Sequence, residues 1–391
     1  MAVIICDISA LEYYRTPPQA RDVQLSADCA GARFLPSNIA TPQTNASDAV
    51  IALHRNIYGQ LKGLSFPIHI ATTSRQRFRA PQVKWHNLQR LSPSDLVLVS
   101  EGLYVTSPVR TLFDLTRGQT RGVVTKLIME FLGLYTSTSS NPLISDAINQ
   151  LRSNGLLTTG TETLAAYYDT KGRPALFPCD HGKELPWTYC GTSAKHASTL
   201  WKRRPLCTLD DLVEFARHMD GAFGIDMFQQ AISMVTPGSA SPLESIIALL
   251  LGPSRRRGQE GMPGFYLNRQ VAVPIDFVES LRSPVLVPDI GWFFENPQRL
   301  LGCCEADGAE YHMPQDEKRH RFYDDSIRRT ALAHICGTPI TITYPQVTDL
   351  QKWDMVLNLI YRTLGLKPRK PTVAFLRVRD QFHRELMSPG I

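Results

Sequence analysis

Residues 288–312, PDIGWFFENPQRLLGCCEADGAEYH, decide how the C-terminal part of this chain is interpreted. Two runs rich in β-forming residues flank a turn-forming segment at residues 295–298, and this order predicts a β-hairpin. If the two strands pair symmetrically about Pro297, Asp289 lies opposite Glu305. The hairpin is therefore expected to hold two carboxylates side by side at one end.

A third carboxylate belongs to the same end of this hairpin. Side chains alternate along a strand, so Glu305 and Asp307 share one face. Carboxylates that lie this close cannot all be charged at low cost unless a cation sits among them. Hard divalent cations prefer oxygen ligands, so the sequence predicts a site for Mg²⁺ above all.

Length and composition indicate a folded protein of several domains. The chain has 391 residues, and a prior of ~150 residues per domain gives two or three domains. A net charge of +6 is compatible with a polyanionic partner but does not require one. No apolar run approaches the ~20 residues of a membrane helix, and the N-terminus lacks the basic region of a signal peptide. We therefore expect a cytoplasmic protein with reduced cysteines and no membrane contact.

Hydrophobic periodicity and turn signals predict an α+β protein in four parts. The first two are a small α+β region, residues 1–118, and a mostly helical region with a Gly/Pro/Cys-containing insertion, residues 119–239. Residues 240–366 alternate strands with helices, which predicts an α/β domain. Residues 367–391 form a basic tail that we expect to be loosely ordered.

An ordered set of short motifs in the C-terminal part carries a family resemblance. The motifs lie at residues 241–244, 288–292, 304–308, 311–312, 325, 328–329, 337 and 340–344. In this order they resemble the very-short-patch-repair-like endonucleases of the PD-(D/E)XK nuclease superfamily, over about residues 240–345. The resemblance implies a restriction-endonuclease-like domain, in which helices flank a central mixed sheet.

The resemblance also implies roles for five residues. Asp289 and Glu305 match metal-binding acids that would hold Mg²⁺ or Mn²⁺, and Glu244 matches a helix acid that supports the metal through water. Asp307 and His312 match an acidic glycine motif and the histidine after it, which could orient the attacking water or take its proton. The implied activity is metal-dependent hydrolysis of DNA phosphodiester bonds, in bacterial defence or DNA repair.

Arginines near this site are candidates for binding DNA phosphates. They are Arg269, Arg319, Arg328 and Arg329.

A second resemblance lies in the N-terminal part. Residues 64–116, and residues 105–115 in particular, resemble a segment of AbiEi-type antitoxin and transcriptional-regulator proteins. That segment implies a toxin as a further partner.

Two departures from the nuclease pattern leave a second function open. Asp307 stands where many superfamily members have lysine, and Thr341 stands where relatives often have arginine. The alternative is a non-catalytic, antitoxin-like regulator that binds DNA or a partner on a degenerate nuclease fold.

Three residue-level alternatives also stay open. Glu244 follows Ser241 by three residues, so a helix capping box explains it without catalysis. His312 has the alternative of a hydrogen-bonded structural histidine, which is the commoner role of a lone histidine. Cys179, His181, Cys190 and His196 raise the alternative of a zinc site, although their spacing fits no standard finger.

Overall fold

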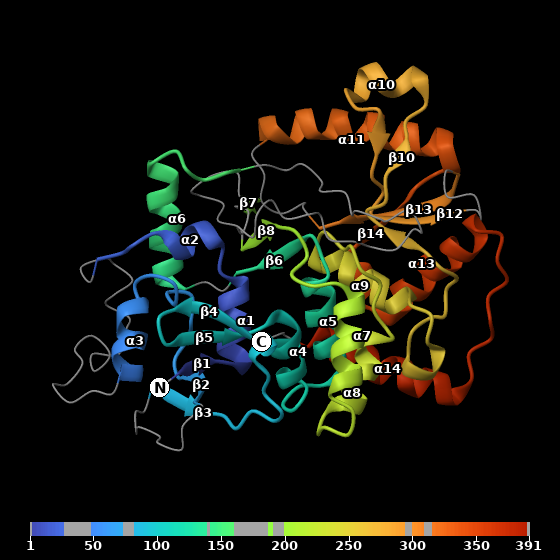
Figure 1. Ribbon diagram of the computed structural model, residues 1–391. Coiled ribbons are helices and arrows are strands. Elements are labelled where there is room, and N and C mark those ends of the chain that lie inside the picture. Colours follow the sequence, from blue (N-terminus) through green and yellow to red (C-terminus); the bar gives the residue numbers. More distant parts are fainter. Residues whose placement is uncertain are drawn as a thin grey trace.

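The computed structural model describes residues 2–26, 48–72, 82–138, 141–159, 187–190, 199–293, 299–308 and 315–388. Helices and mixed sheets follow one another along the chain, so the protein is α+β, as predicted (Figure 1). Among the described residues, none of the helices is long and apolar enough to cross a lipid bilayer.

A five-stranded mixed sheet organises the N-terminal half. Its order is β3-β2-β1-β5-β4, with β1 at Val3–Ile5, β2 at Ile68–Thr72, β3 at Val83–Trp85, β4 at Leu96–Ser100 and β5 at Leu103–Thr106. The central strand β1 pairs antiparallel with β2 and parallel with β5. The α+β region predicted for residues 1–118 did not include β1. This strand has three residues, all fully buried, so it shows no alternation of apolar and polar side chains.

Eight helices and a small sheet surround or extend this N-terminal sheet within the described residues. The helices are α1 Asp7–Arg15, α2 Pro18–Asp22, α3 Asp48–Asn56, α4 Pro108–Leu115, α5 Arg121–Phe131, α6 Pro142–Ser153, α7 Leu209–His218 and α8 Ile225–Ile232. The small sheet has the order β6-β8-β7, with β6 at Tyr135–Ser137, β7 at Thr188–Tyr189 and β8 at Leu200–Lys202. The region expected to be mostly helical therefore also holds strands.

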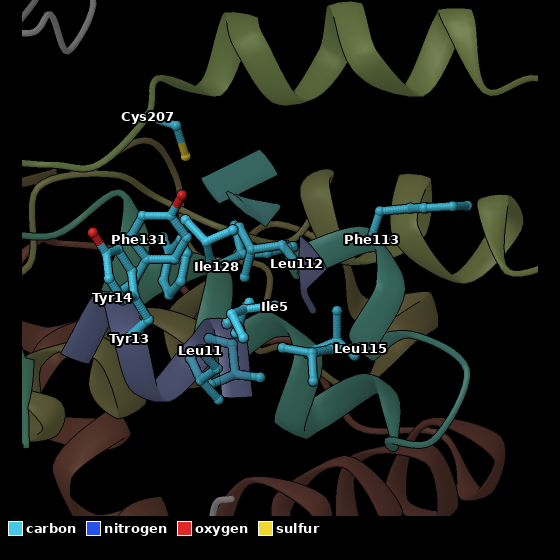
Figure 2. Close-up of a cluster of buried hydrophobic side chains, with 14 of the residues drawn as sticks. Ile5, Leu11, Tyr13, Tyr14, Leu112, Phe113, Leu115, Ile128, Phe131 and Cys207 are labelled. Atoms are coloured by element: carbon cyan, nitrogen blue, oxygen red, sulfur yellow. The ribbon is translucent and has the colours of Figure 1, made fainter. Parts of the chain in front are cut away.

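Residues of α2 and α6 pack in a separate small cluster, whereas one hydrophobic core joins the N-terminal sheet to α1, α3, α4, α5, α7 and α8. It runs from Val3 to Ile232, and Figure 2 shows part of it, where Tyr14 of α1 meets Phe131 of α5. Their ring centroids are 5.9 Å apart in an edge-to-face arrangement. This core continues across residue 118, where the sequence suggested a boundary.

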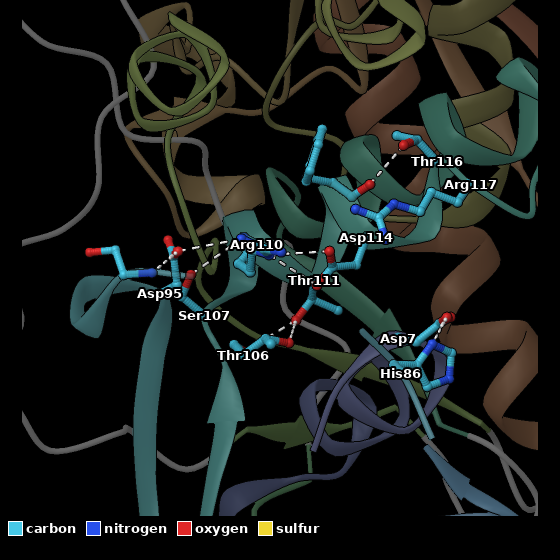
Figure 3. Close-up of polar contacts among 12 residues, drawn as sticks. Asp7, His86, Asp95, Thr106, Ser107, Arg110, Thr111, Asp114, Thr116 and Arg117 are labelled. Atoms are coloured by element: carbon cyan, nitrogen blue, oxygen red, sulfur yellow. Dashed lines mark hydrogen bonds and ion pairs between the residues drawn. The ribbon is translucent and has the colours of Figure 1, made fainter. Parts of the chain in front are cut away.

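Helix α4 is fixed by a buried arginine. Ser107 caps this helix by accepting a hydrogen bond from the Arg110 amide, as Ser-Pro in this position predicts. The fully buried Arg110 side chain donates from Nε to both carboxylate oxygens of Asp114 at 3.1 Å, and its Nη1 lies 3.5 Å from Asp95 Oδ2 (Figure 3). A buried charge is costly without partners. Asp114 supplies a partner within α4, and Asp95, directly before β4, links the helix to the start of that strand.

A four-stranded mixed sheet forms the C-terminal half. Its order is β14-β13-β12-β9, with β9 at Tyr266–Leu267, β12 at Ile290–Phe293, β13 at Leu300–Asp307 and β14 at Ile340–Thr343. Strand β12 is antiparallel to β9 and β13, whereas β13 and β14 are parallel. The remaining elements are η2 Pro93–Asp95, α9 Pro242–Leu251, η3 Arg255–Arg257, β10 Val271–Ala272, α10 Ile275–Leu281, β11 Val285–Leu286, α11 Gln315–Cys336, α12 Tyr344–Thr348, α13 Leu350–Thr363 and α14 Val373–Met387.

Helices cover both faces of the C-terminal sheet. Cys304 and Ile290 face the core formed with α9 and α13. The neighbouring residue Cys303 faces a second cluster that contains Ala331 and Leu332 of α11. A central mixed sheet flanked by helices is therefore present in this half, as expected.

The prediction of a loosely ordered basic tail is wrong. Residues 373–387 form helix α14, whose Phe382 is fully buried. The Glu385 carboxylate accepts a hydrogen bond from the Gly122 amide at 2.9 Å, and Lys126 Nζ donates to the Leu386 carbonyl at 2.7 Å. The prediction rested on the net positive charge of this segment and overlooked its apolar stripe, which packs against α5.

Candidate functional site

Three carboxylates from different elements gather at one end of the C-terminal sheet. Glu244 lies in the first turn of α9, Asp289 directly precedes β12, and Glu305 lies in β13. Ile290 pairs with Cys304, so the next position along the ladder sets Asp289 beside Glu305, as hairpin symmetry predicted. A hydrogen bond of 2.7 Å from the Ala306 amide to Asp289 Oδ2 fixes this arrangement.

The environment of these acids opposes their ionisation. Burial, together with repulsion from Asp289, raises the pKa of Glu244 to about 8. Burial and the same Asp289 carboxylate raise the pKa of Glu305 to about 8. Burial also raises the pKa of Asp289, although the Arg328 charge opposes that rise. Near neutral pH the group therefore holds protons unless a further cation stabilises its charge.

Glu244 combines a helix-capping role with a place in the acid group. Ser241 Oγ accepts a hydrogen bond from the Glu244 amide at 3.2 Å, so Ser241 caps α9 as the sequence predicted. Glu244 Oε2 in turn accepts hydrogen bonds from the Ala240 amide at 2.7 Å and from Asn268 Nδ2 at 2.6 Å. The Ser241 cap is therefore present, but the predicted capping box is formed only in part, because the Glu244 carboxylate accepts from the Ala240 amide instead of the Ser241 amide. Glu244 also lies near enough to Asp289 for the two carboxylates to repel one another.

Asn268 is a residue of the site that sequence reasoning missed. Its backbone φ is +50°, a left-handed conformation that asparagine tolerates better than most residues. The side chain is fully buried and links Glu244 to the Gly238 carbonyl, which it reaches at 3.0 Å. An asparagine that closely follows a short strand is a weak signal, because many such residues form ordinary turns.

Arg328 of α11 reaches into the acid group. One guanidinium nitrogen, Nη2, lies 2.8 Å from Glu305 Oε2 and 3.9 Å from Asp289 Oδ1, and donates to the Val287 carbonyl at 2.6 Å. The other Glu305 oxygen, Oε1, is buried and makes no hydrogen bond to any of the described residues. The group thus pairs part of its negative charge internally and leaves one buried acceptor unsatisfied.

Asp307 and Arg329 lie farther along the same strand and helix. Asp307 Oδ2 is 3.9 Å from Arg329 Nη2, and the side chains of both are substantially exposed. On the adjacent strand β14, Thr341 pairs with Glu305. Asp307 therefore lies outside the buried group, on the face that it shares with Glu305.

The other predicted residues fall at different places. Arg269 stacks over the rings of Tyr266 and Phe293, with its guanidinium carbon 4.3 Å and 5.1 Å from their centroids. His312 lies outside the described residues, and Arg319 belongs to α11 at a position whose side chain is also outside them.

The zinc alternative falls mostly outside the described residues. Cys179, His181 and His196 are not among them. Cys190 is described, and burial raises the pKa of its thiol above the usual value.

A second cluster, which sequence reasoning also missed, lies in the N-terminal half. Within the described part of the chain, Asp7, His69 and His86 are the one group of three potential metal ligands whose ligand atoms all lie within 4.8 Å of one another. These residues are far apart in the sequence and match no spacing motif. The acids around Glu305 are less compact than this triad.

Comparison of the chain with known protein families, curated proteins and solved structures found no match.

Proposed function

We propose that the C-terminal half is a divalent-metal-dependent phosphodiesterase that cuts DNA as an endonuclease. The observation that carries this proposal is the group of desolvated carboxylates at Glu244, Asp289 and Glu305, two of which have a pKa of about 8. Their folded positions agree with the roles that the resemblance to very-short-patch-repair-like endonucleases implies. Buried acids that raise one another's pKa are common at catalytic and metal-binding sites.

The residues fit a hard divalent cation, Mg²⁺ or Mn²⁺. Asp289 and Glu305 supply adjacent carboxylates, and the unsatisfied Glu305 Oε1 offers an oxygen ligand without the loss of a hydrogen bond. Glu244 lies near Asp289, and a hydrogen bond from Asn268 orients its carboxylate. When bound, such a cation lowers the pKa of a water molecule and stabilises phosphoryl charge.

The arginines of α11 supply the positive charge that lysine provides in many members of the superfamily. Arg328 stands against Glu305 and Asp289, where its guanidinium would also reach a phosphate oxygen beside the acids. The more exposed Arg329 would contact the DNA backbone. Arg269, whose guanidinium carbon lies over the Tyr266 ring, places a third cation near the edge strand β9.

The test is cleavage of supercoiled plasmid and single-stranded DNA by the purified full-length chain, with Mg²⁺ and Mn²⁺ tested separately. We expect Asp289→Asn and Glu305→Gln each to reduce cleavage at least about 100-fold, as loss of a group that acts in the transition state does. Glu279→Gln, an exposed position on α10, is the matched control and should cut like the parent. Equal nicking by all four proteins would contradict the assignment.

A non-catalytic binding protein is the second candidate, and one contact favours it. The 2.8 Å ion pair between Arg328 and Glu305 neutralises part of the acid group without a metal. In this alternative the half serves as a scaffold for DNA or for a protein partner such as a toxin. Absence of cleavage, with unchanged DNA affinity of Glu305→Gln in a salt titration, would support this function over the nuclease.

A further inference from the structure

The triad Asp7–His69–His86 lies where β1, β2 and β3 come together. Asp7 is the first residue of α1, directly after β1 and Cys6, His69 lies in β2, and His86 directly follows β3. The backbone holds each position, since the His69 carbonyl accepts from the Cys6 amide at 3.0 Å and the His86 amide donates to the Ile70 carbonyl at 2.8 Å. Figure 3 shows the Asp7 carboxylate facing the His86 ring.

The three side chains are close and largely shielded from water. Asp7 Oδ2 lies 3.3 Å from His86 Nδ1 and 3.9 Å from His69 Nδ1, and His86 Nε2 lies 3.1 Å from His69 Nδ1. The side chains of His69, His86 and Asp7 are 8%, 20% and 24% exposed. Zinc–ligand distances near 2 Å place tetrahedral ligand atoms about 3.3 Å apart. His86 can offer only one of its two ring nitrogens to an ion, and the three ligand atoms then all lie within 4.8 Å of one another. A contraction of the triad around an ion would bring these atoms to the separations of a metal site.

The conformation of Asp7 is the second sign of a built site. Its φ is +55°, in the left-handed region that residues other than glycine seldom occupy. Asp7 is the first residue of α1 and follows the N-cap residue Cys6, which makes no side-chain capping bond, and the Asp7 carboxylate also accepts a hydrogen bond from the Ile8 amide. The backbone therefore adopts an unfavourable conformation that turns this carboxylate toward two imidazoles.

Charge also favours a cation between these groups. The two imidazole rings stack with centroids 4.8 Å apart, and both lie close to the Asp7 carboxylate. Neutral imidazole is the form that binds metals, and the carboxylate supplies negative charge to balance a divalent ion.

We propose that Asp7, His69 and His86 bind a divalent transition-metal ion, with Zn²⁺ as the cation that this ligand set fits best. Two histidines and a carboxylate are the three protein ligands of many zinc sites that keep a fourth position for water or an exogenous ligand. The bound ion would tie the start of α1 to β2 and β3. This site is separate from the acid group around Glu305 and does not depend on its function.

The test uses the full-length chain carrying Asp289→Asn and Glu305→Gln, so that the C-terminal acids do not contribute. After removal of metal by chelation, Co²⁺ is titrated and followed by visible absorption, and Zn²⁺ affinity is measured by competition. We expect one equivalent of Co²⁺ with the intense bands of a four-coordinate nitrogen and oxygen site. His86→Gln or Asp7→Asn should lower Zn²⁺ affinity at least about 100-fold, beyond the loss of an outer-shell partner.

The matched control is His218→Gln, at an exposed histidine of α7 whose ring contacts only the Glu214 carbonyl among the described hydrogen bonds. This variant should bind Co²⁺ and Zn²⁺ like its parent. Circular dichroism of the metal-free proteins checks that His86→Gln keeps its fold. Absence of the Co²⁺ bands in the protein with an intact triad, or equal affinity of His86→Gln and His218→Gln, would overturn the proposal.

Discussion

The stability of the metal-free protein should fall as pH rises, because of Glu305. In the folded chain its pKa is raised from 4.5 to about 8, whereas in the unfolded chain it stays near its ordinary value. Between these values the folded state binds more protons than the unfolded state, so the free energy of unfolding decreases with increasing pH. The loss begins above about pH 4.5, is complete above about pH 8, and does not occur in more acidic solution.

The size of this effect follows from the same pKa. Each pH unit between the folded and unfolded pKa is worth about 1.4 kcal/mol, so a rise from 4.5 to about 8 corresponds to a loss of about 5 kcal/mol. Glu305→Gln cannot ionise and should lack this contribution. Because Asp289 raises the pKa of both Glu305 and Glu244, the three acids titrate as a group and their separate losses do not simply add.

The assay is urea denaturation in chelator from pH 5 to pH 9. Parent and Glu279→Gln should lose several kcal/mol of unfolding free energy over this range, and Glu305→Gln should lose clearly less. Added Mg²⁺ should restore stability at pH 8 in the parent but not in Glu305→Gln, since the cation replaces the protons. Parallel pH curves for parent and Glu305→Gln would refute the reasoning.

Two further predictions concern packing and redox chemistry. Phe382→Ala should lower the free energy of unfolding in urea by about 3–5 kcal/mol, because this side chain of α14 is fully buried. Leu376→Ala, at a side chain of the same helix that is 43% exposed, should change it by less than about 1 kcal/mol, and equal losses would contradict the packing of α14. Diamide should link Cys303 to Cys336, whose sulfurs are 3.6 Å apart, because the hydrogen bond between the thiols lowers the pKa of Cys336 and makes it the attacking thiolate. Both thiols are oxidised while diamide is reduced, so peptide mapping should find this disulfide in the parent and not in Cys303→Ser; a mixture of unrelated pairs would contradict it.

Local signals predicted much of the C-terminal half. Ser241 before a proline and a glutamate marked the start of α9, and the runs around Pro297 indicated the register that sets Asp289 beside Glu305. These features depend on neighbours in the sequence or on the pairing of two consecutive strands. The segment that carries the motifs at residues 325 and 328–329 forms α11, which ends at Cys336.

Features that depend on distant contacts could not be predicted. Strand β1 is central only because β2 and β5 pair with it from far along the chain. Arg328 was expected to contact DNA, but its position against Glu305 required knowledge of how α11 packs on the sheet. Asp7 and His86 are separated by most of the N-terminal sheet in the sequence, so no spacing rule brings them together.

The packing of α14 on α5 has a consequence for the order of events during synthesis. Helix α5 belongs to the N-terminal core, yet its Gly122 amide and Lys126 ammonium are satisfied by residues of α14, near the end of the chain. While the ribosome is still translating the C-terminal half, this surface of α5 lies uncovered. Nascent chains should therefore become fully protease-resistant only after α14 has left the exit tunnel. A ribosome stalled before α14 is synthesised would hold an N-terminal half in which this surface of α5 is still exposed.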